Sequence, residues 1–178
     1  MQTHQLVAHP NFAPGEVKGV TVHLAELADR RLMLRFRVDG GTNLVLPAYR
    51  GRGRGEELWK TTCFELFLYQ GEGRYREFNF SPSGQWAAYE FAGYRNLIGD
   101  FEPRQTPEIK HETGESMFMM TVFLDRRELE GVERAALAAV LEESGGRPSY
   151  WALAHEQLKP DFHDPTGFRI TIPPASAR

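Results

Sequence analysis

The sequence predicts an all-β protein: an antiparallel two-sheet β-sandwich, jelly-roll or immunoglobulin-like, with a short helical turn. Turn-forming clusters rich in glycine and proline, such as HPNFAPGE, SPSGQ and SGGRPS, interrupt the chain at short intervals. Between them lie runs rich in β-branched and aromatic residues, which is the pattern of many short strands joined by turns. Hydrophobic residues make up 41% and charged residues 25% of the 178 residues. This balance suits a single soluble globular domain spanning residues 1–178.

We expect a strand in each of these runs. The expected strands are Val17–Leu24, Arg31–Val38, Cys63–Tyr69, Tyr75–Phe80, Gln85–Phe91, Glu115–Leu124, Ser149–His155 and Phe168–Ile172. The stretch Asp125–Ser144 is ambiguous, because its composition also suits a helix. However, ALAAVLEE followed by SGGRPSYWALAH equally suits two strands joined by a hairpin loop. Our interpretation is a helical turn near Arg126–Glu130, followed by a strand near Ala136–Glu142.

Side chains alternate between the two faces of a strand, so three consecutive strands can each bury one apolar face. The residues expected inside are Phe64, Leu66, Phe78, Phe80, Tyr89, Phe91 and Phe123. The run MFMMTVFL is apolar on both faces and is expected to be central and buried. The opposite face of the three strands would carry Glu65, Glu77, Asn79, Trp86 and Glu90. Such a face suits a binding groove, and it equally suits a plain solvated surface.

Charge and cysteine content narrow the function classes. The formal net charge of −3 argues against a general affinity for nucleic acid or anionic membranes. Cys63 is the only cysteine, so no internal disulfide can form, which suits a reducing compartment. The N-terminus lacks a signal-peptide pattern, and no stretch approaches the ~20 apolar residues of a membrane helix. We therefore expect a cytoplasmic protein, and the oligomeric state stays open.

Three segments carry a recognisable order of motifs across Leu58–Phe168: ELWKTTCFELFL, YREFNFSPSGQWAAYEFAGYR and YWALAHEQLKPDFHDPTGF. A Leu-Trp pair precedes a strand with an acidic residue at its third position, and Tyr-x-Glu-Phe and a Ser-Pro-x-Gly hairpin follow. In this order the chain resembles the bacterial DOMON-like proteins, which are relatives of the family-nine carbohydrate-binding modules. The resemblance implies a β-sandwich and non-enzymatic binding of a sugar or haem on one concave sheet.

The resemblance also implies aromatic rings that clamp a saccharide and polar groups that bind its hydroxyls. Strand parity places Glu65 and Asn79 on one face, and Trp59 shortly precedes the first of these strands. The expected ligand-binding residues are Trp59, Glu65, Asn79, Arg95 and His155, and the secondary candidates are Trp86, Tyr94, Trp151, His163 and Asp164. We expect a small-molecule ligand, a saccharide in the first place, with no catalytic residue, no cofactor and no metal.

The segment WALAHEQLKPDFHDPTGF leaves several interpretations open. It is a poor metal site, because His155 and His163 lack a tight ligand spacing and zinc needs three or four protein ligands. A catalytic cluster would need Cys63 as nucleophile, and a lone cysteine that opens an apolar strand is usually buried and inert. Asp164 before Pro165 instead predicts a capped turn. We interpret the segment as a return loop that these polar residues tie down and that also walls a pocket.

Two alternatives to a sugar-binding protein remain. A haem-binding electron-transfer module would draw a methionine ligand from Met33, Met117, Met119 or Met120, and a Soret band would identify it. A hydrolase or isomerase would use His155 or His163 with a carboxylate, and such a pair in a deep pocket would favour it. For a sugar site, the corresponding observation is Trp59 facing a second aromatic ring across an open groove.

Overall fold

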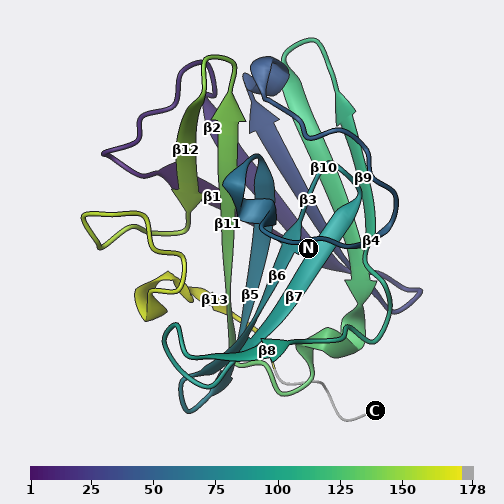
Figure 1. Cartoon of the computed structure of the whole chain (residues 1–178). Helices are drawn as coiled ribbons and strands as arrows, with labels where there is room; N and C mark the ends of the chain where they lie inside the picture. The colour runs from purple at the N-terminus through teal and green to yellow at the C-terminus, as the bar shows by residue number, and fades with distance from the viewer. Residues whose placement is uncertain (174–178) are drawn as a thin grey trace.

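The computed structural model describes residues 1–173, and these residues form an all-β protein, as predicted (Figure 1). The strands are β1 (Gln2–Ala8), β2 (Gly19–Glu26), β3 (Arg31–Asp39), β4 (Gly53–Arg54), β5 (Cys63–Gly71), β6 (Arg74–Phe80), β7 (Gln85–Phe91), β8 (Leu97–Asp100), β9 (Glu108–Thr113), β10 (Met117–Asp125), β11 (Arg134–Glu143), β12 (Arg147–Ala152) and β13 (Ile170–Thr171). Short 3-10 turns occupy Gly41–Asn43, Leu58–Lys60, Arg126–Leu129 and Pro165–Gly167. No helical segment of this part of the chain is long and apolar enough to cross a membrane.

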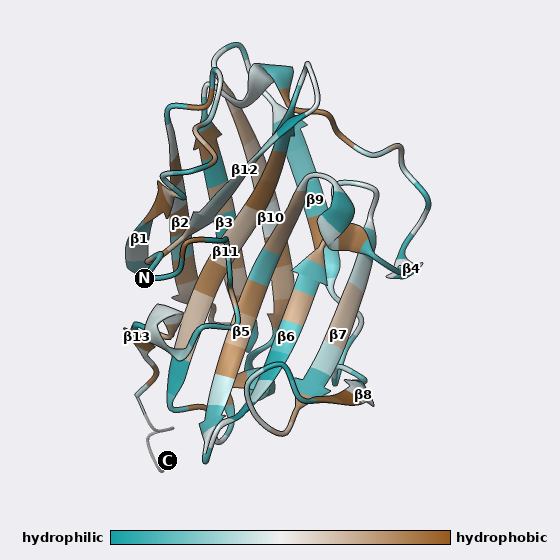
Figure 2. Cartoon of the chain, turned by 60° about the vertical axis from the view of Figure 1, so that its left-hand side comes forward, coloured by the Kyte–Doolittle hydropathy of each residue, from teal (hydrophilic) through white to brown (hydrophobic). Residues whose placement is uncertain are grey.

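The strands form one continuous curled sheet rather than the two separate sheets of the predicted sandwich. Its strand order is β4-β7-β6-β5-β11-β12-β1-β2-β3-β10-β9, with β8 on β7 and β13 on β11. β1 makes the connection, because its residues 2–6 pair with β2 while Val7 and Ala8 pair with β12. The named strands pair antiparallel, except for the two-residue pairing of β4 with β7. The result is a half-barrel whose two halves face each other (Figures 1 and 2).

Aromatic contacts across the inside of the curled sheet join its halves. The ring centroid of Phe64 on β5 lies 4.9 Å from that of Phe36 on β3 and 5.9 Å from that of Phe118 on β10. Fully burying a side chain of this size contributes roughly 1.5–3 kcal/mol, so the inside of the sheet is the main core. Its buried residues include the predicted Phe64, Leu66, Phe78 and Phe80.

The predicted faces of β7 are reversed in the structure. The register pairs Trp86 with Phe80 and Tyr89 with Glu77. Trp86 is therefore buried in the core, and Tyr89 lies half-buried on the outer face of the sheet. Phe91 is buried as predicted, but it too belongs to a cluster outside the main core. The strand QWAAYEF carries aromatic residues on both faces, so alternation alone does not determine which face is inside.

The prediction that β10 is buried on both faces is wrong. The strand lies between β3 and β9, but only one of its faces packs into the core. Phe123, predicted inside, is half-buried on the other face. Its ring is covered by the guanidinium of Arg31 at 4.3 Å and the ammonium of Lys110 at 5.7 Å. Phe123 is therefore shielded by long cationic side chains rather than by a further layer of the fold.

The ambiguous stretch Asp125–Ser144 forms the predicted helical turn followed by strand β11. Asp125 caps the turn by accepting the backbone N–H of Arg127 at 2.8 Å. β11 lies between β5 and β12 in the middle of the sheet, and this tertiary context overrides its helix-forming composition. Ala136 and Ala138 on its outer face leave room for the C-terminal segment to pack there.

Candidate functional site

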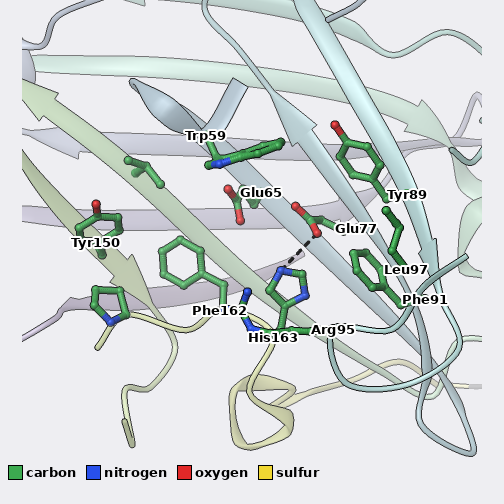
Figure 3. Close-up of a pocket in the computed structure, with 12 residues that line it drawn as sticks. Trp59, Glu65, Glu77, Tyr89, Phe91, Arg95, Leu97, Tyr150, Phe162 and His163 are labelled. Atoms are coloured by element: carbon green, nitrogen blue, oxygen red, sulfur yellow. Dashed lines mark ion pairs between the residues drawn. The ribbon is translucent and has the colours of Figure 1, made fainter. Parts of the chain in front are cut away.

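A pocket of 400 Å³ lies on the outer face of β5, β6, β7 and β11, the face that points away from the core. The segment 156–168, which follows β12, packs over part of this face and forms one wall. Trp59 lies at the rim, Glu65 and Glu77 form the floor, and His163 enters from the covering segment (Figure 3). Pockets of ~300–1,000 Å³ commonly hold small molecules, so this volume suits one.

The floor of the pocket is made of polar residues on two paired strands. Glu65 on β5 pairs with Asn79 on β6, and Glu77 lies diagonally beside Glu65 on the same face. All three are buried, with exposed fractions of 3% for Glu65, 7% for Glu77 and 0% for Asn79. Asn79 Nδ2 donates to Glu77 Oε1 at 3.0 Å, and Asn79 Oδ1 has no partner among the described residues. Glu65, by contrast, makes no side-chain hydrogen bond to any described residue.

Burial changes the acidity of the groups on this floor. Burial and the nearby charge of Glu77 raise the pKa of Glu65 well above its usual range. Burial raises the pKa of Glu77 to about 7, against the lowering effects of the Asn79 hydrogen bond and the Arg95 charge. Groups this close titrate as a pair, so the pair retains a proton at neutral pH. Burial and the two carboxylates also raise the pKa of the Cys63 thiol well above its usual range, which removes it as a nucleophile.

A histidine and a tyrosine extend this polar network. The Tyr75 hydroxyl accepts the backbone N–H of Arg95 at 3.1 Å and bonds His163 Nδ1 at 2.7 Å. His163 Nε2 is 3.6 Å from Glu77 Oε2. Burial, with a smaller effect of Arg95, lowers the pKa of His163 to about 4, so the ring is neutral at pH 7.

The turn between β7 and β8 closes the pocket on one side. Arg95 in this turn has a left-handed backbone, with φ 52°, and its Nη2 donates to Asp161 Oδ1 at 2.8 Å. Tyr94 donates its hydroxyl to the same carboxylate, which also accepts the backbone N–H of His163 at 3.1 Å. Asp161 thus joins the turn to the covering segment and holds His163 in place.

Aromatic side chains surround the opening of the pocket. Trp59 is 43% exposed, and its ring centroid lies 6.4 Å from that of Tyr89 at an interplanar angle of 72°. The two rings are therefore edge to face and do not form a parallel clamp. Phe162 and Tyr150 lie on the other side of the pocket (Figure 3). Between these two sides of the pocket, the exposed indole of Trp59 lies beside the buried carboxyl groups.

The structure brings together several of the residues that the sequence proposed for a site. Trp59, Glu65, Arg95 and His163 line the pocket, and Asn79 lies beneath it as a partner of Glu77. Sequence reasoning placed Glu77 on the correct face without naming it as a site residue, and it missed the aromatic walls. Strand parity could have identified Glu77, because it shares its face with Asn79.

His155 lies outside the pocket, contrary to the prediction. Its Nε2 lies 3.0 Å from the backbone carbonyl of Val7, and its ring is 4.8 Å from that of His9. The side chain therefore ties the segment after β12 to the end of β1. Glu90 also lies apart from the floor, in an ion pair with Arg74 at 3.3 Å.

The remaining secondary candidates have structural surroundings of their own. Trp86 packs in the core with Arg54 4.6 Å above its ring, and Trp151 is a core residue whose Nε1 donates to Ser149 Oγ at 2.9 Å. Tyr94 and Asp164 line a separate, more open hollow beside the covering segment. Asp164 caps the following turn, as predicted. Its carboxylate accepts from the backbone N–H of Thr166 at 2.9 Å and from Gln157 Nε2 at 2.8 Å.

The structure also locates the residues considered for metal or haem. Within residues 1–173, no group of three or more His, Cys, Asp or Glu side chains is placed to hold a metal ion. The methionines considered as haem ligands lie on β3 and β10, in the half of the sheet that does not carry the pocket: Met33, Met117, Met119 and Met120.

Comparison with known proteins identifies a similar fold but does not assign the chain to a family. No family model and no curated protein matches the chain. Among solved structures, the chain is similar to the crystal structure of a "putative carbohydrate-binding protein" from Bacteroides uniformis ATCC 8492, with a TM-score of 0.67 and 16% sequence identity. The match covers 94% of this chain and 84% of that one. At this identity the likeness establishes the fold alone.

Proposed function

We propose that the pocket binds a small saccharide, and that the protein is a non-catalytic binding protein related to the DOMON-like proteins and the family-nine carbohydrate-binding modules. The observation that carries the proposal is the exposed indole of Trp59 in the same pocket as the buried carboxyl group of Glu65. That carboxyl group has no hydrogen-bond partner among the described residues. The B. uniformis protein, which shares this fold and is described as a "putative carbohydrate-binding protein", supports the same class of ligand.

The chemistry of a sugar ring suits these groups. Its apolar C–H face packs on an indole, and its hydroxyl groups need both donors and acceptors. The partly protonated pair of Glu65 and Glu77 offers both within one pocket, and Arg95 adds a donor at the wall. With one stacking contact and few hydrogen bonds, we expect an affinity of roughly micromolar to millimolar.

Titration calorimetry against a panel of mono- and oligosaccharides tests this proposal. Trp59→Ala should abolish binding and change the free energy of unfolding by less than about 0.5 kcal/mol, because the side chain is at the rim. Tyr49→Ala is the matched control, since Tyr49 is an exposed aromatic residue that does not line the pocket. The proposal fails if no sugar produces a response at roughly tens of millimolar.

A second candidate, glycoside hydrolysis, is favoured by the approach of His163 to Glu77 inside the pocket, at 3.6 Å. Paired carboxyl groups of unequal acidity can serve as general acid and base. Incubation with aryl glycosides and oligosaccharides distinguishes the two candidates. Turnover that disappears in Glu77→Gln would favour hydrolysis, and binding without turnover would favour the saccharide-binding protein.

A further inference from the structure

Glu65 and Glu77 form an acidic floor that lacks a protein counter-charge. Glu65 is 3% exposed, points into the pocket, and has no hydrogen-bond or ion-pair partner among the described residues (Figure 3). Within the same part of the chain, the one ion-pair contact of Glu77 is with His163, whose imidazole is neutral. An ionised carboxylate buried without a cation is costly, so the free pair holds a proton instead. The unpartnered carboxyl group of Glu65, which lines an open pocket, is therefore available to a ligand.

We propose that the ligand carries a positively charged amino group that lies against Glu65 and Glu77, so that the site selects amino sugars over neutral sugars. This inference rests on the proposed saccharide-binding function and specifies its ligand class. An ammonium group supplies three donors and a charge, which matches two carboxyl groups on one floor. The walls add to the attraction, because the faces of Trp59 and Tyr89 are electron-rich and attract cations.

The other charges around the pocket leave the floor acidic. Arg95 is the one permanent cation among the lining residues, and its guanidinium is paired with Asp161 at 2.8 Å. His163 contributes no charge at neutral pH. Burial raises the pKa values of the titratable groups nearest the pair, so these groups are uncharged at neutral pH: Cys63 on β5, Tyr75 on β6 and Tyr89 on β7.

The pair has no evident role in holding the sheet together. Glu65 makes no side-chain bond to a described residue, and the bond of Glu77 is to its strand neighbour Asn79. Apolar residues at these positions would pack on the outer face without any desolvation of charge. A pair kept in spite of this cost indicates a role toward a ligand.

Binding of an ammonium group should release a proton. Burial raises the pKa of Glu77 to about 7 in the free protein, and a cation in the pocket lowers it by favouring the charged form. Near neutral pH, the pair therefore loses a proton when an amino sugar binds and keeps it when a neutral sugar binds. Proton release provides a readout that sugar stacking on Trp59 does not produce.

The experiment compares matched triplets of sugars by titration calorimetry near pH 7. Glucosamine, galactosamine and mannosamine are each tested beside the neutral parent sugar and the N-acetyl derivative, so that only one substituent changes within a triplet. Each titration is repeated in two buffers of different ionisation enthalpy, which gives the number of protons released. In at least one triplet we expect the amino sugar to bind roughly tenfold more tightly than the other two members, with release of about one proton.

Variants connect this preference to the acidic floor. Glu65→Gln and Glu77→Gln should each lower the ratio of amino-sugar to parent-sugar affinity toward one. The control Glu112→Gln, an exposed residue on β9, should leave that ratio unchanged. Equal affinities within every triplet overturn the inference and leave the saccharide-binding proposal standing. Absence of binding in all triplets overturns the inference, and absence of binding to the whole panel of mono- and oligosaccharides overturns both.

Discussion

Replacing Glu77 with glutamine should change how the stability of the protein depends on pH. The pKa of Glu77 is about 7 in the folded protein, against an ordinary value of 4.5. The folded state therefore holds this proton more tightly than the unfolded state does. The contribution of Glu77 to stability is full below about pH 4.5 and is lost as the pH rises to about 7. A difference of about 2.5 units corresponds to a loss of ~3 kcal/mol over this range.

His163 should mask this loss in the wild-type protein. Burial lowers its pKa from 6.5 to about 4, so its folded form favours the neutral imidazole. The stability that it contributes is therefore gained as the pH rises from about 4 to about 6.5, by a similar ~3 kcal/mol. With opposite slopes in overlapping ranges, the two groups nearly cancel. Removing Glu77 should remove its share of the opposition to His163, while Glu65, whose pKa is also raised, is still present in both proteins.

Urea unfolding at a series of pH values, followed by tryptophan fluorescence, measures the effect. The free energy of unfolding of Glu77→Gln minus that of the wild type should rise by ~3 kcal/mol between about pH 4.5 and pH 7. Glutamine preserves the shape of the side chain and an acceptor for Asn79, so the fold should persist. Glu112→Gln, exposed on β9, is the control and should follow the wild type. If the free energy of unfolding of Glu77→Gln and that of the wild type follow parallel curves against pH, the conclusion that Glu77 is buried and protonated is wrong.

The other predictions concern His163, the core and the covering segment. His163→Gln should show the opposite pH effect, its stability relative to the wild type falling by ~3 kcal/mol between about pH 4 and pH 6.5; an unchanged difference over that range would contradict the neutral buried imidazole. Phe78→Ala should cost ~3–5 kcal/mol in urea unfolding, whereas Phe123→Ala on the half-buried face should cost about 1 kcal/mol; equal losses would argue against the assigned faces. Asp164→Ala should cost ~1 kcal/mol through the lost cap on Thr166, and a neutral result would show that the cap does not stabilise the segment.

The alternation of apolar and polar residues predicted most of the strands, but it did not predict how the strands join into one sheet. Each expected strand has a counterpart in the structure, from β2 through β13. β1, β4, β8 and β9 were not expected, because QTHQLVA, GR, LIGD and EIKHET are short or polar and give a weak apolar alternation. β1 is the strand that joins the two halves. The sequence therefore predicted an all-β fold, while the single curled sheet depended on a strand without a clear signal.

The candidate site was predictable where it depends on strand parity and not where it depends on the path of a loop. Glu65 and Asn79 lie opposite each other on one face, as alternation requires. Which histidine reaches the pocket depends instead on tertiary contacts. His155 is held by the backbone of Val7 in the unexpected strand β1. His163 is positioned by Tyr75 and Asp161, which are distant from each other in the sequence.

The polar face of β5 and β6 could have been a plain solvated surface, and its burial argues against that alternative. A solvated carboxylate keeps its hydration and its ordinary pKa, whereas Glu65 and Glu77 are buried and their pKa values are raised. If segment 156–168 served only to cover the sheet, apolar residues beneath it would stabilise the fold more. The segment leaves a pocket above these two carboxyl groups and places His163 at its wall. Buried carboxyl groups that cost stability are expected at functional sites. The covering segment is therefore better explained as a wall of a binding pocket than as a cover for the sheet.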